Sequence, residues 1–376
     1  MPEQLPSANP QAMTPLVFVL TVVCCLVSLG CRNDEIGESR QPSLAAATLT
    51  AIDSVLLEEA GGAFIAKPAD LVVGHGGTLL IPDVGMKRLF EFAADGRSVR
   101  SFGHAGSGPG EFVSPGWSTL VADSTILVKD NPALELEAFS LTRGQWMWSR
   151  RLPSSVTSGI AYAGDDILVA ELNAQSRTSF LRIPLDSSRG TVAAGALPQD
   201  AHGDAALANA FRQSVLAPQG SRVAQAFEVS NWILIFDERG LPTDSIHLPV
   251  ARRKGAPVRL LPLLRDDPSR VMEAVNHVSQ PIALAWLSDT ILGLVTVDAD
   301  RTVRRYAGPT YLTVVDTRTR RACVDAVVPA PLDPPPVARF VADTLVLVYA
   351  DTSLTGAPEA RVKRLLIDTS TCSWAM

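Results

Sequence analysis

The stretch LFEFAADGRSVRSFGHAGSGPGEF (89–112) decides the fold of this chain. An apolar run ends in an AADG turn, an alternating run follows, and a glycine-rich segment leads onward. Short runs of this kind, bounded by Gly, Asp and Pro, are typical of β-strands joined by tight turns. The stretch therefore predicts two strands and a connection to the next structural unit.

The glycines of SFGHAGSGPGEF (101–112) also raise the question of a phosphate-binding loop. Such a loop has the pattern GxxxxGK[ST] between a strand and a helix. Gly103 and Gly108 fit the two glycine positions, but Pro109 stands where lysine is required and lacks a backbone N–H. No helical pattern follows. We therefore expect this stretch to connect structural units and not to bind phosphate.

The same combination of turns and short apolar runs recurs along the chain. Six segments combine a turn with an apolar run too short for a helix: 76–83, 123–130, 164–171, 219–226, 288–295 and 342–349. A second apolar run that ends in a polar turn follows each: 89–96, 136–144, 180–190, 232–240, 312–320 and 365–373. A further strand follows in most units, for instance at 98–103. One such sheet cannot bury both faces alone, so the repeat predicts an all-β, six-bladed propeller with four-stranded antiparallel blades.

We expect the strand at 48–57 to pair into the last blade and to close the ring, so that the propeller spans 48–376. A small helical insertion is predicted near 251–280, where Asp267 can cap a helix that starts at Pro268. A β-sandwich followed by a second domain is the alternative architecture.

Composition agrees with a turn-rich β protein. The chain of 376 residues is 47% apolar and 19% charged, with 27 prolines and 26 glycines. This profile argues against a disordered or coiled-coil chain. The net charge of −6 is mild and the arginine clusters are short, so we expect no nucleic-acid partner.

Residues 13–31, MTPLVFVLTVVCCLVSLGC, hold an apolar core from Pro15 to Gly30 that ends at Cys31. The core is shorter than the roughly 20 residues of a membrane-spanning helix. It fits the apolar region of an export signal instead. An uncleaved anchor or an ordinary signal peptide is the alternative.

The segment Ser28-Leu29-Gly30-Cys31 resembles the lipobox of bacterial lipoproteins, although Ser28 stands where Leu is usual and no Lys or Arg precedes the core. The missing charge suggests that translation starts at Met13. The resemblance implies a signal peptide at 1–30, lipidation of Cys31 and a linker at 31–47. It also implies a cell-envelope protein that reaches a bacterial membrane through its lipid.

The blade connection itself carries a second resemblance. Strand, glycine turn, strand and FGxxGxGPGEF are similar to the NHL-type repeat, closely over 77–130 and in part over 231–240. With the signal segment, the chain resembles the six-bladed β-propeller lipoproteins of bacteria. Many members of that family lack an assigned activity.

Two cysteines remain outside the signal segment, Cys323 and Cys372. An even pair in an oxidising compartment predicts a disulfide, which would join the final two blades. Two buried free thiols are the alternative.

Acidic residues end the first apolar run of three units, as Asp83, Asp130 and Glu171. Pseudo-symmetry would bring them to one end of the propeller, where they could bind Ca²⁺ or a cationic ligand group. The alternative is that these carboxylates cap the following turns. No other cofactor is expected.

Further ligand-binding candidates are His75 and His104 in glycine-rich turns, and Arg259, Arg265 and Arg270 in the 251–280 insertion. For each, a structural role is the alternative. No hydrolase, zinc or nucleotide-binding motif is present in the sequence. We therefore predict a monomeric binding or interaction module for an extracytoplasmic ligand or partner protein. A metal-assisted lyase or lactonase-type hydrolase is the alternative function.

Overall fold

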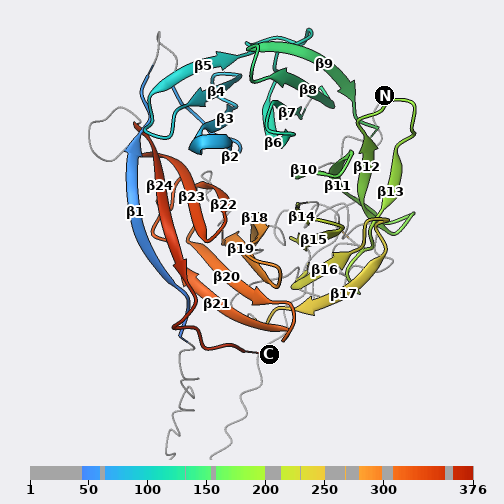
Figure 1. Cartoon of the computed structure of the whole chain (residues 1–376), viewed down its shortest axis with the longest axis vertical. Helices are drawn as coiled ribbons and strands as arrows, with labels where there is room; N and C mark the ends of the chain where they lie inside the picture. The colour runs from blue at the N-terminus through green and yellow to red at the C-terminus, as the bar shows by residue number, and fades with distance from the viewer. Residues whose placement is uncertain are drawn as a thin grey trace, which may run out of the picture. The chain divides into compact units, whose positions relative to one another are not determined.

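The computed structural model describes residues 45–59, 64–131, 133–153, 158–199, 213–228, 230–249, 267, 279–298, 308–351 and 359–375. All of them belong to the unit Leu44–Met376. Apart from the 3₁₀ turn η1 (His75–Gly77), every regular element in these ranges is a β-strand. The strands form six four-stranded antiparallel sheets arranged in a ring (Figure 1). The predicted six-bladed propeller is confirmed.

In each of the first three blades, the strands follow in chain order from the inner strand to the outer strand. Blade one contains β2 (Val72–Val73), β3 (Leu79–Asp83), β4 (Arg88–Phe92) and β5 (Ser98–Phe102). Blade two contains β6 (Pro115–Val121), β7 (Thr125–Asp130), β8 (Glu135–Ser140) and β9 (Gln145–Arg151). Blade three contains β10 (Ile160–Ala163), β11 (Asp166–Asn173), β12 (Thr178–Pro184) and β13 (Val192–Ala194).

The last three blades repeat this order, with one exception in blade six. Blade four contains β14 (Ser214–Gln219), β15 (Arg222–Phe227), β16 (Trp232–Phe236) and β17 (Pro242–His247). Blade five contains β18 (Gln280–Trp286), β19 (Ile291–Val297), β20 (Thr310–Asp316) and β21 (Arg321–Val327). Blade six contains β22 (Val337–Val341), β23 (Thr344–Asp351), β24 (Glu359–Asp368) and, as its outer strand, β1 (Thr48–Leu56).

Strand β1 closes the ring. It pairs antiparallel with β24, from Thr48 opposite Asp368 to Leu56 opposite Arg361. The prediction that the early strand joins the last blade is therefore confirmed. The ring is therefore closed by the backbone hydrogen bonds between β1 and β24.

Alternation of side chains explains why the short apolar runs form blades. Along β3, Leu79 and Ile81 pack toward blade six, whereas Leu80 packs toward blade two. Successive side chains of a strand point to opposite faces of the sheet. A continuous apolar run therefore serves two blade interfaces at once, and stacking around the ring buries both.

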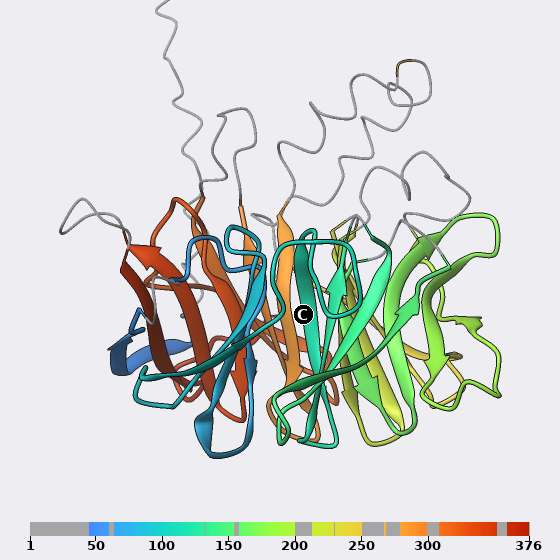
Figure 2. The ribbon, with the colours of Figure 1, turned by 90° about the horizontal axis from the view of Figure 1, so that it is seen from above.

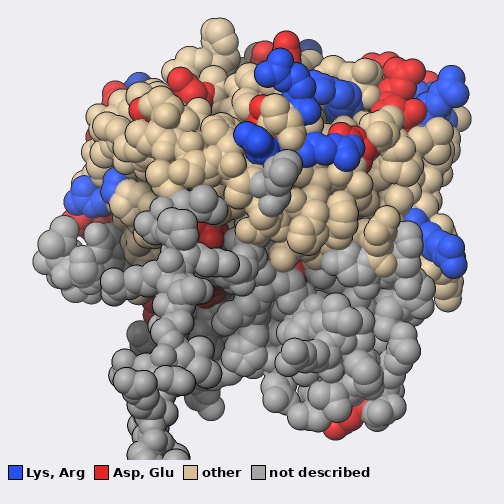
Figure 3. All heavy atoms as spheres, turned by 90° about the horizontal axis from the view of Figure 1, so that it is seen from below, with Lys and Arg blue, Asp and Glu red and all other residues tan. Residues whose placement is uncertain are grey.

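Blades one to five each place two of their connections on one face of the ring, and blade six places one there. The first and second strands, and the third and fourth, are joined at the same end of an antiparallel sheet. We call this end the turn face; it is the lower edge in Figure 2. In Figure 3, Lys and Arg side chains gather toward this face and are interleaved with Asp and Glu.

The connection between blades one and two is a packed structural element. Phe112 is fully buried, and its ring centroid lies 5.5 Å from that of Phe139. Gly103 has a φ of 68°, and a Cβ there would lie 2.6 Å from the Phe112 ring. Glu111 folds back to accept a hydrogen bond from Gly108 N (2.8 Å). These contacts explain the glycines without any ligand.

Arginine side chains bridge neighbouring blades at the turn face. Each donates a hydrogen bond to a backbone carbonyl in a turn-face segment of the next blade around the ring. The pairs are Arg100 with Leu141, Arg150 with Pro184 and Leu185, Arg182 with Glu238, Arg222 with Asp289, and Arg364 with Ala94. The bridges start from second, third or fourth strands, so no fixed sequence position marks them.

A tryptophan reaches across the centre of the ring. Trp117 on β6 packs against the apolar cluster of blades two and three and against that of blades four and five. Its indole therefore fills space between blades that are not neighbours.

The C-terminal segment fastens blade five to blade six. A disulfide joins Cys323 on β21 to Cys372, with their Cα atoms 5.6 Å apart. Ala375 forms a β-bridge with Ala322, and Ser373 N donates to Ala45 O (2.8 Å). The segment that contains Cys372 therefore also holds the residues that lead into β1.

Nearly all of the helical insertion predicted near 251–280 lies outside the described residues, as does the N-terminal segment that contains Cys31. Within the described part, no helix is long and apolar enough to cross a membrane.

Candidate functional site

The acidic residues predicted from the repeat bind the backbone that enters each blade. Asp83 accepts hydrogen bonds from Lys67 N (2.6 Å) and Met86 N (2.7 Å). Asp130 accepts them from Val113 N (2.7 Å) and Ser114 N (2.6 Å). Both carboxylates thus clamp the segment before the inner strand to the end of the second strand.

Blade four repeats the clamp with a displaced acid. Glu228 accepts hydrogen bonds from Gln213 N (3.3 Å) and Gln280 Nε2 (3.1 Å). Glu171, the third predicted residue, lies half-buried on β11. Across the described ranges, His, Cys, Asp and Glu form no group of three that could hold a metal ion. The cation site at this end of the ring therefore stays a prediction.

The two predicted histidines lie apart, on different connections. His75 is exposed in η1, before β3. His104 is exposed in the connection between blades one and two, where its Nδ1 lies 3.7 Å from Glu111 Oε1. The three predicted arginines, Arg259, Arg265 and Arg270, lie outside the described residues.

Four buried ionisable groups have shifted pKa values, and burial raises that of Glu137 on β8. Burial raises the pKa of Asp70 and of Asp83, although backbone N–H donors partly offset the effect. Burial lowers the pKa of Lys129 on β7 to about 8. Desolvation disfavours the charged form in all four cases. Asp70 accepts hydrogen bonds from Ser118 N and Oγ, which link blade one to blade two.

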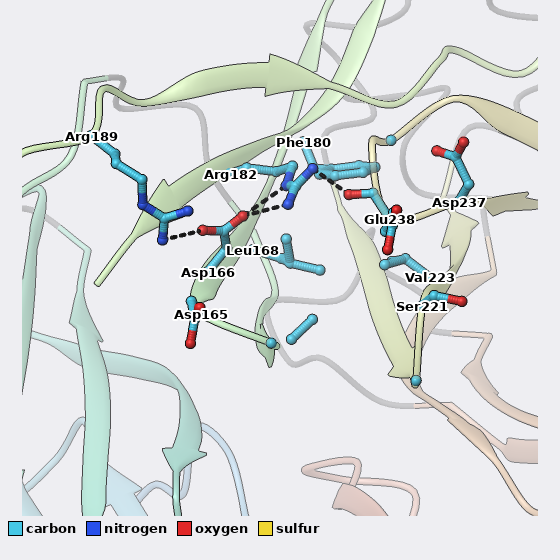
Figure 4. Close-up of a pocket in the computed structure, with 14 residues that line it drawn as sticks. Asp165, Asp166, Leu168, Phe180, Arg182, Arg189, Ser221, Val223, Asp237 and Glu238 are labelled. Atoms are coloured by element: carbon cyan, nitrogen blue, oxygen red, sulfur yellow. Dashed lines mark hydrogen bonds and ion pairs between the residues drawn. The ribbon is translucent and has the colours of Figure 1, made fainter. Parts of the chain in front are cut away.

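A cavity of about 370 Å³ lies between blades three and four and opens at the turn face (Figure 4). We call it the interblade pocket. Three turns border it, 163–165, 220–221 and 237–240. The side chains of Asp166, Leu168, Phe180, Arg182, Arg189 and Val223 complete its lining.

The floor of the interblade pocket is apolar. Leu168 on β11, Phe180 on β12 and Val223 on β15 are buried, with 2%, 1% and 6% of their surface exposed. Phe180 is held edge-on by Phe236, with 5.3 Å between ring centroids. The floor is therefore closely packed, and it offers contact to the carbon skeleton of a ligand.

An ion-pair network stands on this floor. The Asp166 side chain, 7% exposed, accepts hydrogen bonds from Arg182 Nε (2.9 Å) and Nη2 (2.5 Å) and from Arg189 Nη2 (3.3 Å). Arg182 Nη1 also donates to Glu238 O of blade four. Paired guanidinium groups held by a buried carboxylate are preorganised, because little rotamer freedom is left to lose.

Three further carboxylates border the opening. Asp165 and Glu238 are exposed, and Asp237 accepts hydrogen bonds from Arg239 N (2.9 Å) and Leu241 N (2.8 Å). Among the described residues, none of the three forms an ion pair. The lining thus contains four acids and two arginines, a net charge of −2.

The sequence signals did not point to this site. Its charged residues come from turns, from β11 and from β12, and all of them lie within the runs 164–171, 180–190 and 232–240, which were interpreted only as strands and turns. The acid of GDDILV at 166 is shared with no other unit. The DERG turn at 237–240 was recognised only as hairpin chemistry.

Comparison with known proteins supports the fold. No protein-family model matches the chain, and no curated protein sequence matches it. A protein described as exported, from Bacteroides fragilis, superposes with a TM-score of 0.60 at 15% identity, over 86% of this chain and 96% of its own. A DUF4221-family member from Bacteroides vulgatus gives a TM-score of 0.58 at 8% identity, over 86% and 99%. The chain is a six-bladed propeller.

A third structure shows the limit of the comparison. Virginiamycin B lyase from Staphylococcus aureus gives a TM-score of 0.49 at 13% identity, over 85% of this chain and 99% of its own. Likeness at that level carries no argument about activity, and identities this low show the fold alone.

Proposed function

We propose that the protein is a binding module whose interblade pocket holds a small organic ligand. One observation carries the proposal: a cavity of about 370 Å³ combines an apolar floor with an ion-pair network that spans two blades. Small-molecule sites have this composition, with a few fixed polar groups on an apolar surface. The groups present bind and orient a ligand; none of them is paired as a nucleophile with a base.

The test blocks the pocket without touching its floor. Ser221 is exposed at the second position of the β14–β15 turn, so Ser221→Trp places an indole at the opening. Asp343 holds the corresponding position in the β22–β23 turn of blade six and is also exposed. Asp343→Trp is therefore the matched control.

A small-molecule library is screened by thermal shift against the wild type and both variants. We expect hits that stabilise the wild type and Asp343→Trp but not Ser221→Trp, because ligand binding raises stability by mass action. Hits that stabilise all three proteins equally would contradict a site at the interblade pocket.

We also propose that the protein is exported and lipid-anchored. The apolar segment that ends at Cys31 supports this proposal, as does the likeness to a protein described as exported. The FGxxGxGPGEF connector supports an NHL-type origin of the blades. In a bacterial host, the wild type is expected in the membrane fraction and Cys31→Ala in the soluble fraction. If the two proteins fractionate equally, the lipid-anchor proposal is wrong.

A further inference from the structure

The interblade pocket carries opposite charges at its two ends. Figure 4 shows Arg189 at one end and Asp237 and Glu238 at the other, with Asp166 and Arg182 between them. Arg189 belongs to blade three, whereas Asp237 and Glu238 belong to the β16–β17 turn of blade four. The separation therefore spans the cleft between the two blades.

The Arg189 end is built to accept an anion. Within the described residues, Arg189 makes one side-chain hydrogen bond, from Nη2 to Asp166 Oδ1 (3.3 Å). A guanidinium group has five N–H donors in a planar fork, and this fork matches the two oxygens of a carboxylate. The Arg189 side chain is 49% exposed and retains donors for a ligand. Asp165 lies toward the same end and weakens this site by repulsion.

The opposite end is built to accept a cation. Glu238 is exposed, and in the described structure its carboxylate accepts no hydrogen bond. Arg182 holds the Glu238 backbone carbonyl, so the turn is fixed while the side chain is available. Asp237 adds a second negative charge beside it, fixed by the N–H groups of Arg239 and Leu241.

Between the two ends, the floor of Leu168, Phe180 and Val223 offers no charge. A ligand that follows the pocket therefore meets a cation, then an apolar surface beside the paired Asp166 and Arg182, and then two carboxylates. A simple anion would be repelled at the Glu238 end, and a simple cation would offer no acceptor to the remaining N–H donors of Arg189.

We propose that the interblade pocket binds a short peptide with free termini and apolar side chains. Its carboxylate pairs with Arg189, its ammonium group with Glu238 and Asp237, and its side chains pack on the floor. This inference rests on the proposed function and specifies the ligand class of the same site.

The experiment uses one dipeptide in four charge forms: Leu-Phe, N-acetyl-Leu-Phe, Leu-Phe-amide and N-acetyl-Leu-Phe-amide. Calorimetry on the full-length mature protein measures the Kd of each. Because partly exposed ion pairs contribute up to about 1 kcal/mol, each blocked terminus should weaken binding about five-fold. The doubly blocked form should bind about 25-fold more weakly than Leu-Phe.

Pocket variants assign each terminus to its partner. Arg189→Gln should remove the preference for a free carboxylate and leave the preference for a free amine, and Arg189→Lys should restore part of it. Glu238→Gln should do the reverse. Asp165→Asn should tighten binding of the free carboxylate, because it removes a repulsive neighbour. Asp123→Asn, an exposed turn residue of blade two, is the control with the same charge change and no expected effect.

The outcomes separate this inference from the proposed function. If Leu-Phe binds no better than a singly blocked form, the peptide assignment is wrong. The proposed function would still be supported if the library screen gives hits whose stabilising effect is lost in Ser221→Trp. If Leu-Phe binds and Ser221→Trp leaves its Kd unchanged, both the peptide assignment and the pocket are wrong.

Discussion

Blades one and two meet through three phenylalanine rings, whereas the junction of blades three and four contains a cavity at the turn face. In the first junction, Phe102 and Phe112 both pack on Phe139, at 5.7 and 5.5 Å between ring centroids. In the second, Phe180 lies at the floor and an ion pair stands above it. The two junctions share an arginine bridge to the next blade, from Arg100 and Arg182 respectively.

Each of the two junctions receives an apolar side chain from the segment that connects its blades. The SGPGEF loop inserts Phe112 into the first junction, and Gly110 N fixes that loop to Glu137 Oε2 (3.3 Å). Between blades three and four, Leu197 of the connecting segment is likewise buried, in the cluster that contains Phe180 and Phe236, and the cavity lies beside this cluster. A propeller can therefore leave a pocket open at a blade junction while the rest of the ring keeps it stable.

The largest effect is expected in the closed junction. Phe112→Ala should lower the free energy of unfolding by about 3–5 kcal/mol, because it leaves a dry cavity among fully packed rings. Leu168→Ala in the open junction should cost about 2 kcal/mol, since solvent in the pocket fills part of the space. Denaturant titration measures both. Equal losses would show that the two junctions are packed alike.

The disulfide should contribute the next largest effect. Replacing Cys323 and Cys372 together with Ala should cost about 2–4 kcal/mol, because the bridge closes a long loop in the unfolded chain. Thiol labelling of the denatured wild type should rise after reduction. Equal labelling with and without reductant would show that the bridge is absent.

A pH-dependent effect is expected at the junction between blades two and three, where Lys129 lies on the strand face that carries Leu127. The pKa of Lys129 is about 8 when folded and 10.5 in a model chain, so the folded state holds fewer protons between these values. Stability should therefore rise with pH across this window, by at most about 3 kcal/mol.

Lys129→Met should abolish that rise and should be more stable than the wild type at pH 7. The exposed Lys67→Met is the control. A constant difference between Lys129→Met and wild type from pH 7 to pH 11 would rule out the shifted lysine.

Most of the fold could be predicted because short, local sequence patterns determine its strands and turns. The apolar runs, the closing strand at 48–57 and the connector at 101–112 each depend on residues that are close together in sequence or repeated at regular intervals. The Cys323–Cys372 pair could be predicted because these are the two cysteines outside the signal segment. The structure places each of these as predicted.

The pocket could not be predicted, for a physical reason. Asp166, Arg189 and Glu238 come together because two blades stack, and their spacing of 23 and 49 residues follows no repeat. The acids that do repeat, Asp83 and Asp130, are occupied by backbone N–H donors. Periodicity therefore identified the runs that build the ring, but it did not show which charged side chains within those runs meet at the cavity.

Hydrogen exchange of the backbone amides, with and without saturating Leu-Phe, tests the central claim most directly. Amides in the turns 163–165, 220–221 and 237–240 border the pocket. They should exchange more slowly with the dipeptide bound, while those of the closed junction at 103–112 should not change. Unchanged exchange in the three turns, or protection at 103–112 instead, would contradict a ligand site between blades three and four.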